Sequence, residues 1–303
     1  MNFFDVFSEM LVILFCMAAG FLAHKLGYLG GETDQRLCRL ILGITMPCLI
    51  LGSVSAGDTL PSAGEILSIL KVAAVYYGLG FLAAAFVPRL LGGTAKQQGV
   101  WRYCLVFANM AFIGYPVSVA LFGQDALFYA VILVLPFNLL SFSLGPLMLA
   151  GQAKFRWQQL TSPCVIAAVA ALVVALCRLN IPALAGECLN FVGSLTTPLS
   201  LLVVGSLLAD LPFGRAFTSL RLWILTALRL LILPGVLWLV LKWTGIGTPL
   251  VDDIAVILMA TPAALNGSML AMEYGGDTEC MAQSIFLTTL MSILTIPVLA
   301  ALL

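Results

Sequence analysis

Two stretches of sequence decide how this chain is interpreted: residues 107–116 read FANMAFIGYP, and residues 259–268 read MATPAALNGS. Each places asparagine, glycine and proline near the centre of an apolar segment. Proline removes a backbone hydrogen-bond donor and clashes with the preceding turn, while glycine tolerates the unwound backbone that follows. Inside a bilayer such a break is tolerated only where it is buried in protein or lines a cavity. The pair therefore predicts two membrane helices that are broken midway.

The composition is that of a membrane protein. Of 303 residues, 62% are hydrophobic and 9% are charged, against roughly 25% charged in soluble domains. Fourteen Lys and Arg balance fourteen Asp and Glu, so the net charge indicates no nucleic-acid partner. One crossing takes about 20 apolar residues. We predict an all-α polytopic protein with ten transmembrane helices, at Phe7–Leu26, Leu40–Ser55, Leu67–Val87, Tyr103–Phe122, Leu127–Leu149, Pro163–Cys177, Phe191–Leu208, Trp223–Leu241, Ile254–Met272 and Met281–Leu303.

The positive charges predict the orientation of the chain. The odd-numbered connections between segments hold ten of the fourteen Lys and Arg residues, and the even-numbered ones hold three. Positive charge gathers on the cytoplasmic side, so both termini are expected on the non-cytoplasmic side. The start of the sequence lacks the positive region of a signal peptide, and we expect no cleaved leader.

The chain also shows an internal duplication. At an offset of 151 residues, three prolines of the first half (Pro47, Pro61, Pro146) fall on prolines of the second (Pro198, Pro212, Pro297), where about 0.3 coincidences are expected by chance. Five segments per half is an odd number, so the second copy must be inverted. We expect two inverted five-helix repeats, residues 1–151 and 152–303, which is typical of secondary transporters. The alternative is chance spacing in a proline-rich membrane protein.

The broken helices predict the site. If they cross near the midplane, the N-termini of their half-helices converge there, each with a partial positive charge of about half a unit, and such ends bind anions. Their centres hold no Asp or Glu, which a cation-binding antiporter would need. Arg229 is the one charge well inside a segment, and its partner is either a structural carbonyl or a substrate carboxylate. The candidate substrate-binding residues are Asn109, Gly114, Tyr115, Pro116, Pro262, Asn266, Gly267 and Arg229.

These motifs resemble those of the auxin efflux carrier family. Its fourth-helix pattern is met by Asn109, Gly114 and Pro116, and its ninth-helix pattern is similar to residues 261–266 followed by residues 271–275. The resemblance covers nearly the whole chain. It implies an architecture like that of sodium–proton antiporters and bile-acid transporters. Scaffold helices 1, 2, 6 and 7 would lie within residues 1–60 and 160–211, and a mobile transport domain within residues 65–150 and 215–303.

The resemblance also implies a function. Family members move organic anions such as malonate, malate or indole-3-acetate, and Asn109 matches the family asparagine that contacts substrate. Residues 151–159 form only a short connection, without the long cytoplasmic loop of plant members, and Asn266 is similar to the bacterial ones. We expect an elevator-type secondary active transporter for a small organic anion, in a bacterial inner membrane and dimeric through scaffold helices 2 and 7.

Two alternatives stay open at this point. The first is a sodium-coupled symporter of the bile-acid type, for which the candidate oxygen ligands are Asn138, Ser141, Ser143, Thr288 and Thr289. The second is a membrane-embedded enzyme, which we do not expect because no acid pair occurs within a segment and His24 lies at a segment end. Eight cysteines without a CxxC pair and a single histidine predict neither a metal site nor a cofactor. Substrate identity, direction of transport and coupling ion are left undecided by the sequence.

Overall fold

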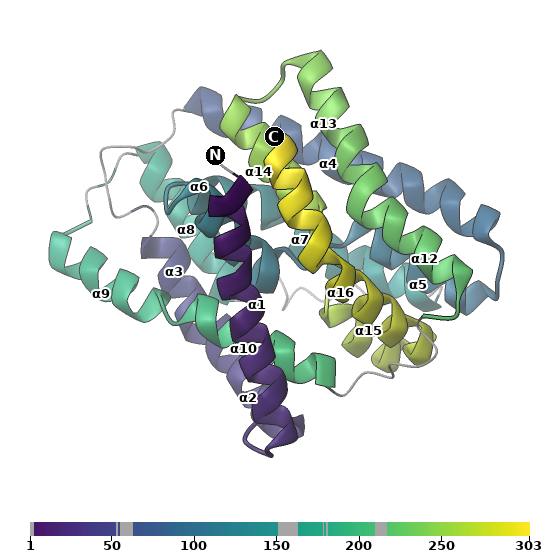
Figure 1. Cartoon of the computed structure of the whole chain (residues 1–303). Coiled ribbons are helices and arrows are strands. Elements are labelled where there is room, and N and C mark those ends of the chain that lie inside the picture. Colours follow the sequence, from purple (N-terminus) through teal and green to yellow (C-terminus); the bar gives the residue numbers. More distant parts are fainter. Residues whose placement is uncertain are drawn as a thin grey trace.

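The computed structural model describes residues 3–52, 54, 63–150, 163–177, 179, 181–209 and 217–303. Within these residues the regular elements are helices, apart from one isolated pair of bridged residues (Figure 1). In the first half they are α1 (Phe3–Lys25), α2 (Gly31–Leu40), η1 (Ile41–Thr45), α3 (Met46–Gly52), α4 (Ala63–Leu91), α5 (Ala95–Val106), η3 (Met110–Gly114), α6 (Tyr115–Phe122) and α7 (Ala126–Ala150). In the second half they are α8 (Pro163–Cys177), α9 (Ala183–Gly193), α10 (Thr196–Ala209), α12 (Leu220–Ala227), η5 (Leu228–Ile232), α13 (Leu233–Thr244), α14 (Pro249–Met259), α15 (Asn266–Tyr274) and α16 (Thr278–Leu302).

Several of these helical stretches are long and apolar enough to cross a bilayer. Among the described residues five qualify by length and composition, and the two ends of the chain lie at the same end of the molecule (Figure 1). The five are Gly31–Gly52, Gly64–Leu91, Ala183–Ala209, Leu220–Thr244 and Thr278–Leu302. The prediction of an all-helical membrane protein is thus confirmed in its coarse form.

Two helical stretches begin earlier than the apolar pattern predicted. The second segment was expected from Leu40, but its helix begins at Gly31, and the seventh was expected from Phe191, but its helical stretch begins at Ala183. The polar residues of α2 are helical because they find partners. Asp34 is 2% exposed, and its carboxylate accepts hydrogen bonds from the Gly30 N–H (3.0 Å) and the Ser206 hydroxyl (2.6 Å).

Two helix pairs that join the halves of the chain pack with their backbones in contact. A methyl group at Gly205 of α10 would overlap the carbonyl oxygen of Met17 in α1, and one at Gly20 would overlap that of Leu202. In the second pair, α3 and α9, a Cβ at Gly193 would lie 2.7 Å from the Cα of Leu49. Small residues permit this close approach in membrane helices. Together with α2 and α8, these four helices form one side of the molecule.

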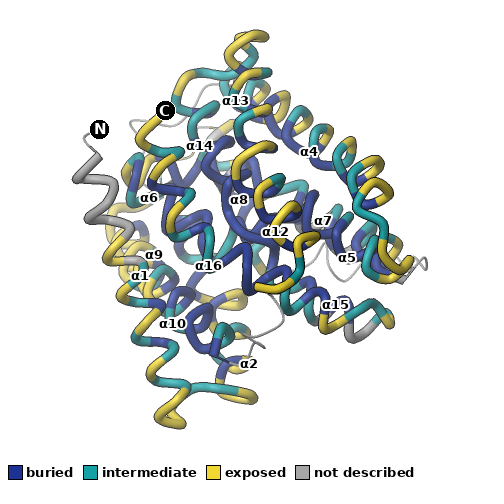
Figure 2. The backbone as a smooth tube through the Cα atoms, turned by 45° about the vertical axis from the view of Figure 1, so that its right-hand side comes forward, coloured by how far each residue is buried: buried dark blue, intermediate teal, exposed yellow. Residues whose placement is uncertain are grey.

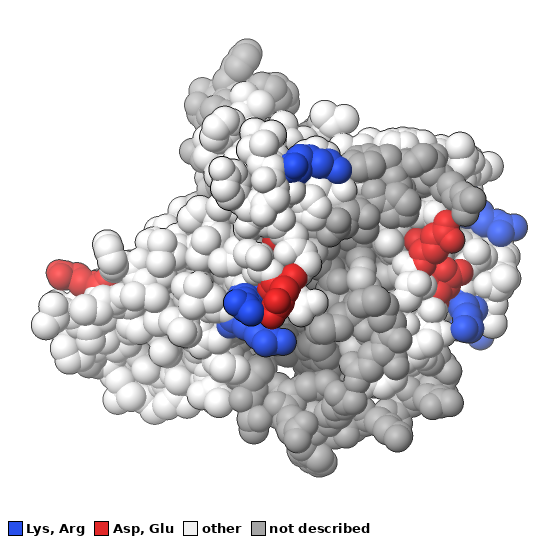
Figure 3. All heavy atoms as spheres, turned by 90° about the horizontal axis from the view of Figure 1, so that it is seen from below, with Lys and Arg blue, Asp and Glu red and all other residues white. Residues whose placement is uncertain are grey.

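The remaining helices form a second bundle with a buried centre. Figure 2 shows buried backbone at the centre of the molecule and exposed stretches along its outer helices. All described α14 residues from Ile254 to Met259 are buried, whereas large apolar side chains such as Leu90 (86% exposed) and Trp243 (95% exposed) face outward. Among the described atoms seen from below, charged side chains gather in a few groups and most other atoms are uncharged (Figure 3). An apolar exterior is what a lipid environment requires.

We expect Gly205→Ala to destabilise the protein, because the added methyl group overlaps backbone that cannot rotate away. Overpacking of this kind costs about 1–3 kcal/mol, so the thermal midpoint of purified protein in detergent should fall by several degrees. Gly235→Ala in α13 is the matched control, since a Cβ there meets nothing within 4 Å. Equal midpoints for the two variants would contradict the close contact of α1 and α10.

Candidate functional site

Both broken segments are interrupted, and their interruptions are joined to each other. Ala108 and Ala263 form an isolated antiparallel bridge. The N–H of Asn109 donates to the carbonyl of Pro262 at 2.7 Å, and the N–H of Ala264 donates to the carbonyl of Phe107 at 3.1 Å. These two bonds satisfy backbone groups that no helix pairs, as backbone buried in a membrane requires. The predicted breaks are confirmed, and they meet.

The first break does not lie where its proline is. The helix α5 ends at Val106, and Phe107 has extended backbone angles (φ −104°, ψ 112°). A π-helical turn, η3, follows, and Pro116 lies in the first turn of α6, where a missing N–H is tolerated. Gly114, Tyr115 and Pro116 were expected at the break, but the structure places Gly114 at the end of this turn and Tyr115 and Pro116 in α6 after it. The break itself belongs to residues 107–109.

The second break does coincide with its proline. The helix α14 ends at Met259, and α15 begins at Asn266, so Pro262 lies in the irregular backbone between them. Proline cannot donate to the carbonyl four residues earlier and disfavours helical geometry in the residue before it. The N–H of Ala263 donates to the hydroxyl of Thr288 in α16, at 3.2 Å. The Thr288 side chain thereby links the second break to α16.

The two predicted glycines let the broken segments approach each other. A Cβ at Gly114 would lie 2.6 Å from a methyl carbon of Leu258 in α14, and a Cβ at Gly267 would lie 2.7 Å from the ring of Tyr103 in α5. Each glycine of one broken segment is therefore pressed against the other segment. Their role in the structure is close packing rather than unwinding.

Asn109, at the crossing, has one side-chain donor without a partner among the described residues. It is 4% exposed and caps η3, with its Oδ1 accepting from the N–H of Phe112 at 3.3 Å. Its Nδ2 is buried and has no hydrogen-bond partner among the described residues. A buried unpaired amide costs free energy of about 1–3 kcal/mol. Nδ2 is thus a donor available to a ligand.

Asn266, its counterpart, is already engaged. Its Oδ1 accepts from the hydroxyl of Tyr103 at 3.0 Å, and its Nδ2 donates to the hydroxyl of Ser141 at 3.3 Å. The hydroxyls of Tyr103 and Ser141 lie 2.9 Å apart. Tyr103 was not predicted, because nothing in the local sequence distinguishes it from other aromatic core residues. Ser141 was predicted only as a candidate sodium ligand.

Arg229 contacts the end of α5, the helix that leads into the crossing. It is completely buried in η5, and its Nη1 donates to the carbonyl of Leu105 in the last turn of α5, at 3.3 Å. Its Nε and Nη2 have no hydrogen-bond partner in the described part of the chain. Cations are favoured beside the carbonyls of a helix C-terminus. Of the two partners considered for Arg229, the structural carbonyl is therefore present.

Two narrow crevices flank η3. One, of about 40 Å³, has Met46 and Cys164 on one side and Ala111, Tyr115 and Phe137 on the other. The second, of about 20 Å³, lies between α1, the η3–α6 segment and α16. Both crevices lie between the second bundle and the side of the molecule that contains the helix pairs α1–α10 and α3–α9. About 10–15 Å³ of such space holds one water molecule, so each crevice has room for a few waters at most and neither holds a diacid as it stands.

The crossing combines donors with positive helix ends. The segments η3–α6 and α15 both begin within three residues of the bridge, and their first N–H groups carry partial positive charge. In the described residues no group of three or more His, Cys, Asp or Glu side chains could hold a metal ion. The chemistry present favours a small anion over a metal cation.

We expect Tyr103→Phe to lower the stability of the protein by about 1–3 kcal/mol, because Asn266 Oδ1 loses its buried donor. The ring keeps its packing, so a lower thermal midpoint would report the hydroxyl alone. Tyr28→Phe, at a side chain 75% exposed, is the control and should leave the midpoint unchanged. A second Asn266→Ala substitution should add less to Tyr103→Phe than it costs alone; full additivity would argue against the contact.

Comparison with known proteins identifies the family. The sequence model described as membrane transport protein matches residues 5–152 and 146–300. An uncharacterized transporter of Methanothermobacter thermautotrophicus is 24% identical over 98% of each chain, and one of Methanocaldococcus jannaschii is 26% identical over 94% of this chain and 95% of its own. A protein of Rhizobium meliloti named putative malonate transporter is 23% identical over 91% of this chain and 89% of its own. The chain therefore belongs to the membrane transport protein family, that of the auxin efflux carriers, and is a multi-pass transporter rather than an enzyme.

Proposed function

We propose that the protein is a secondary active transporter for a small organic anion, whose carboxylate binds at the crossing of the two broken segments. The observation that carries this proposal is the buried Nδ2 of Asn109, which has no partner among the described residues. It lies at the start of η3, where the helix end adds partial positive charge. A carboxylate oxygen would satisfy this donor and be stabilised by that field.

The surroundings of Asn109 suit an anion of this kind. Tyr115 and Pro116 shape the adjoining turn, while Pro262, Asn266 and Gly267 form the opposite half of the site. Arg229 contributes a full positive charge behind the break. In a water-poor interior such a charge acts over a longer distance than at a surface, so it favours the bound anion whether or not it touches it.

Transport requires the site to open, and we infer that one bundle moves against the other. The scaffold, within residues 1–60 and 160–211, contains the glycine-packed pairs α1–α10 and α3–α9. The transport domain, within residues 65–150 and 215–303, contains the crossing. The crevices beside η3 lie along the boundary and are narrow. Packed interfaces resist continuous deformation, so a rigid displacement in the manner of an elevator is the simplest way to admit a diacid.

The same proposal includes a membrane topology. Ten crossings arranged as two inverted repeats, residues 1–151 and 152–303, would place both termini on the non-cytoplasmic side of a bacterial inner membrane. The common location of the two chain ends supports an even number of crossings (Figure 1). We further propose a homodimer formed through scaffold helices 2 and 7.

Malonate is the first substrate to test. The relative named putative malonate transporter supports a small dicarboxylate, with malate and an auxin-like carboxylate as the other candidates. Sodium coupling receives little support from Ser141, which bonds Asn266 and Tyr103, or from Thr288, which bonds backbone, whereas the buried hydroxyl of Thr289 has no partner among the described residues. The side chain of Asn138, also named for a sodium site, lies outside the described residues.

Counterflow of labelled malonate in proteoliposomes tests the site. We expect Asn109→Ala to lower kcat/KM at least about tenfold, since a hydrogen bond to a charged group is worth roughly 1.5–3 kcal/mol, and Asn109→Asp to lower it further by repelling the anion. Gln98→Ala removes an amide at the far end of the same segment and should behave as the parent. Equal counterflow by the parent and both Asn109 variants would remove Asn109 from the site.

Arg229 gives a second, separable test. We expect Arg229→Met to raise KM for malonate about tenfold or more, and Arg229→Lys to recover part of the affinity, because the charge matters more than the fork of donors. Thermal midpoints of both variants check that they fold. If Met and Lys variants of equal stability show the same KM, the charge of Arg229 has no part in binding.

A further inference from the structure

Positive side chains gather where two of the long apolar helices meet the edge of the bilayer. Arg89 is in the last turn of α4 and Lys96 in the first turn of α5, on either side of the turn that begins at Gly92. Arg221, in the first turn of α12, extends to the same turn, where its Nη2 would lie 3.8 Å from a Cβ at Gly92. Arg89 lies near the end of one stretch long enough to cross a bilayer, and Arg221 near the start of another. These three residues, the basic cluster, therefore lie at the level expected for lipid headgroups.

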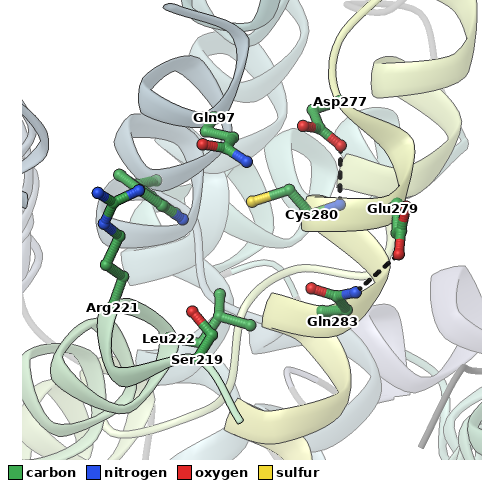
Figure 4. A pocket seen from close by; sticks show the side chains of 9 residues that line it. Gln97, Ser219, Arg221, Leu222, Asp277, Glu279, Cys280 and Gln283 are labelled. Atoms are coloured by element: carbon green, nitrogen blue, oxygen red, sulfur yellow. Dashed lines mark hydrogen bonds between the residues drawn. The ribbon is translucent and has the colours of Figure 1, made fainter. Parts of the chain in front are cut away.

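The basic cluster has no anionic partner in the described part of the chain. All three side chains are exposed, and none of them forms an ion pair or a hydrogen bond with a described residue. Figure 4 shows Arg221 on one side of a polar cavity of about 200 Å³, with Asp277 and Glu279 on the other. Asp277 accepts from the N–H of Cys280 at 2.9 Å, and the side chain of Glu279 points away from Arg221. Neither carboxylate forms an ion pair with the basic cluster.

Apolar side chains are exposed beside the basic cluster. Leu82, Phe86 and Leu90 recur every fourth residue, so they lie along one face of α4, which ends at the cluster. In α12 the exposed residue Trp223 donates its indole N–H to the carbonyl of Phe217 at 3.0 Å. Tryptophan is enriched at the headgroup level of membranes. The surface thus combines positive charge with an adjoining apolar face, a pattern that fits a phospholipid better than a free anion.

We propose that the basic cluster binds the headgroup of an anionic phospholipid. The phosphate would lie among Arg89, Lys96 and Arg221, and an acyl chain would lie along the exposed face of α4. Basic pockets between membrane helices bind lipid headgroups through this charge complementarity. A zwitterionic lipid such as phosphatidylcholine carries its own cation, which three neighbouring positive charges repel. The bound lipid would connect the end of α4 to the start of α12, and its binding does not depend on the cargo site.

Thermal stabilisation of the purified full-length protein by lipid tests this site. A ligand that binds the folded state raises the melting temperature by mass action. In detergent micelles we expect phosphatidylglycerol to raise it by several degrees more than phosphatidylcholine with the same acyl chains. Arg89→Gln combined with Arg221→Gln should remove this difference. Arg36→Gln combined with Arg39→Gln, at two exposed arginines of α2, removes the same charge elsewhere and should keep the difference.

Equal midpoints with the two lipids would overturn the proposal. A rise with inorganic phosphate as large as that with phosphatidylglycerol, at equal ionic strength, would overturn it too, because the site would then bind an anion and not a lipid. A phosphatidylglycerol effect that survives in the Arg89 and Arg221 double variant would place the lipid elsewhere. Native mass spectrometry gives a readout that does not depend on stability. Only the Arg89 and Arg221 double variant should retain fewer phosphatidylglycerol molecules than the parent, and equal retention by the two double variants would contradict the site.

Discussion

Two backbone hydrogen bonds, between Asn109 and Pro262 and between Ala264 and Phe107, are the constraint on which the rest of the site depends. A helix interrupted inside a bilayer exposes amide and carbonyl groups that lipid cannot satisfy. Here the N–H and carbonyl groups of one interruption pair with those of the other. Because the bridge pairs a segment of the first half with one of the second, the half-helix ends, the capping asparagine and the two packing glycines are placed relative to one another by the same contact.

The two halves carry similar motifs but do different things with them. In the first half, Asn109 caps a π-helical turn, and its amide nitrogen has no partner among the residues that the structure describes. In the second half, both ends of the Asn266 amide are held, by Tyr103 and by Ser141. The two halves therefore have similar sequence motifs but different hydrogen bonds at their asparagines. At the proposed site the Asn266 amide is thus held at both ends, whereas Asn109 keeps a donor available for the carboxylate that we propose binds there.

Features that depend on local interactions could be predicted from the sequence, whereas features that depend on contacts between distant residues could not. The second break was located correctly because Pro262 acts on its own backbone. The first was displaced, because the backbone angles of Phe107 and the π-turn before Pro116, rather than the proline, determine where α5 stops. The bonds from Asn266 to Tyr103 and Ser141 span 163 and 125 residues of sequence, and no local pattern specifies such a pair. The start of α2 was missed for the same reason, since Asp34 becomes an acceptable helical residue only once Ser206 is beside it.

The contact of α1 with α10 has a consequence for how the protein is made. The residues that join these helices at one end, His24 and Ser206, are 182 positions apart. At about 5–20 residues per second, a ribosome needs roughly 10–40 s to pass from one to the other. During that interval the first helix has entered the bilayer without the neighbour whose backbone it must touch. Contact between α1 and α10 thus waits on the later part of translation, and an N-terminal fragment alone would leave the glycine face of α1 without its partner helix.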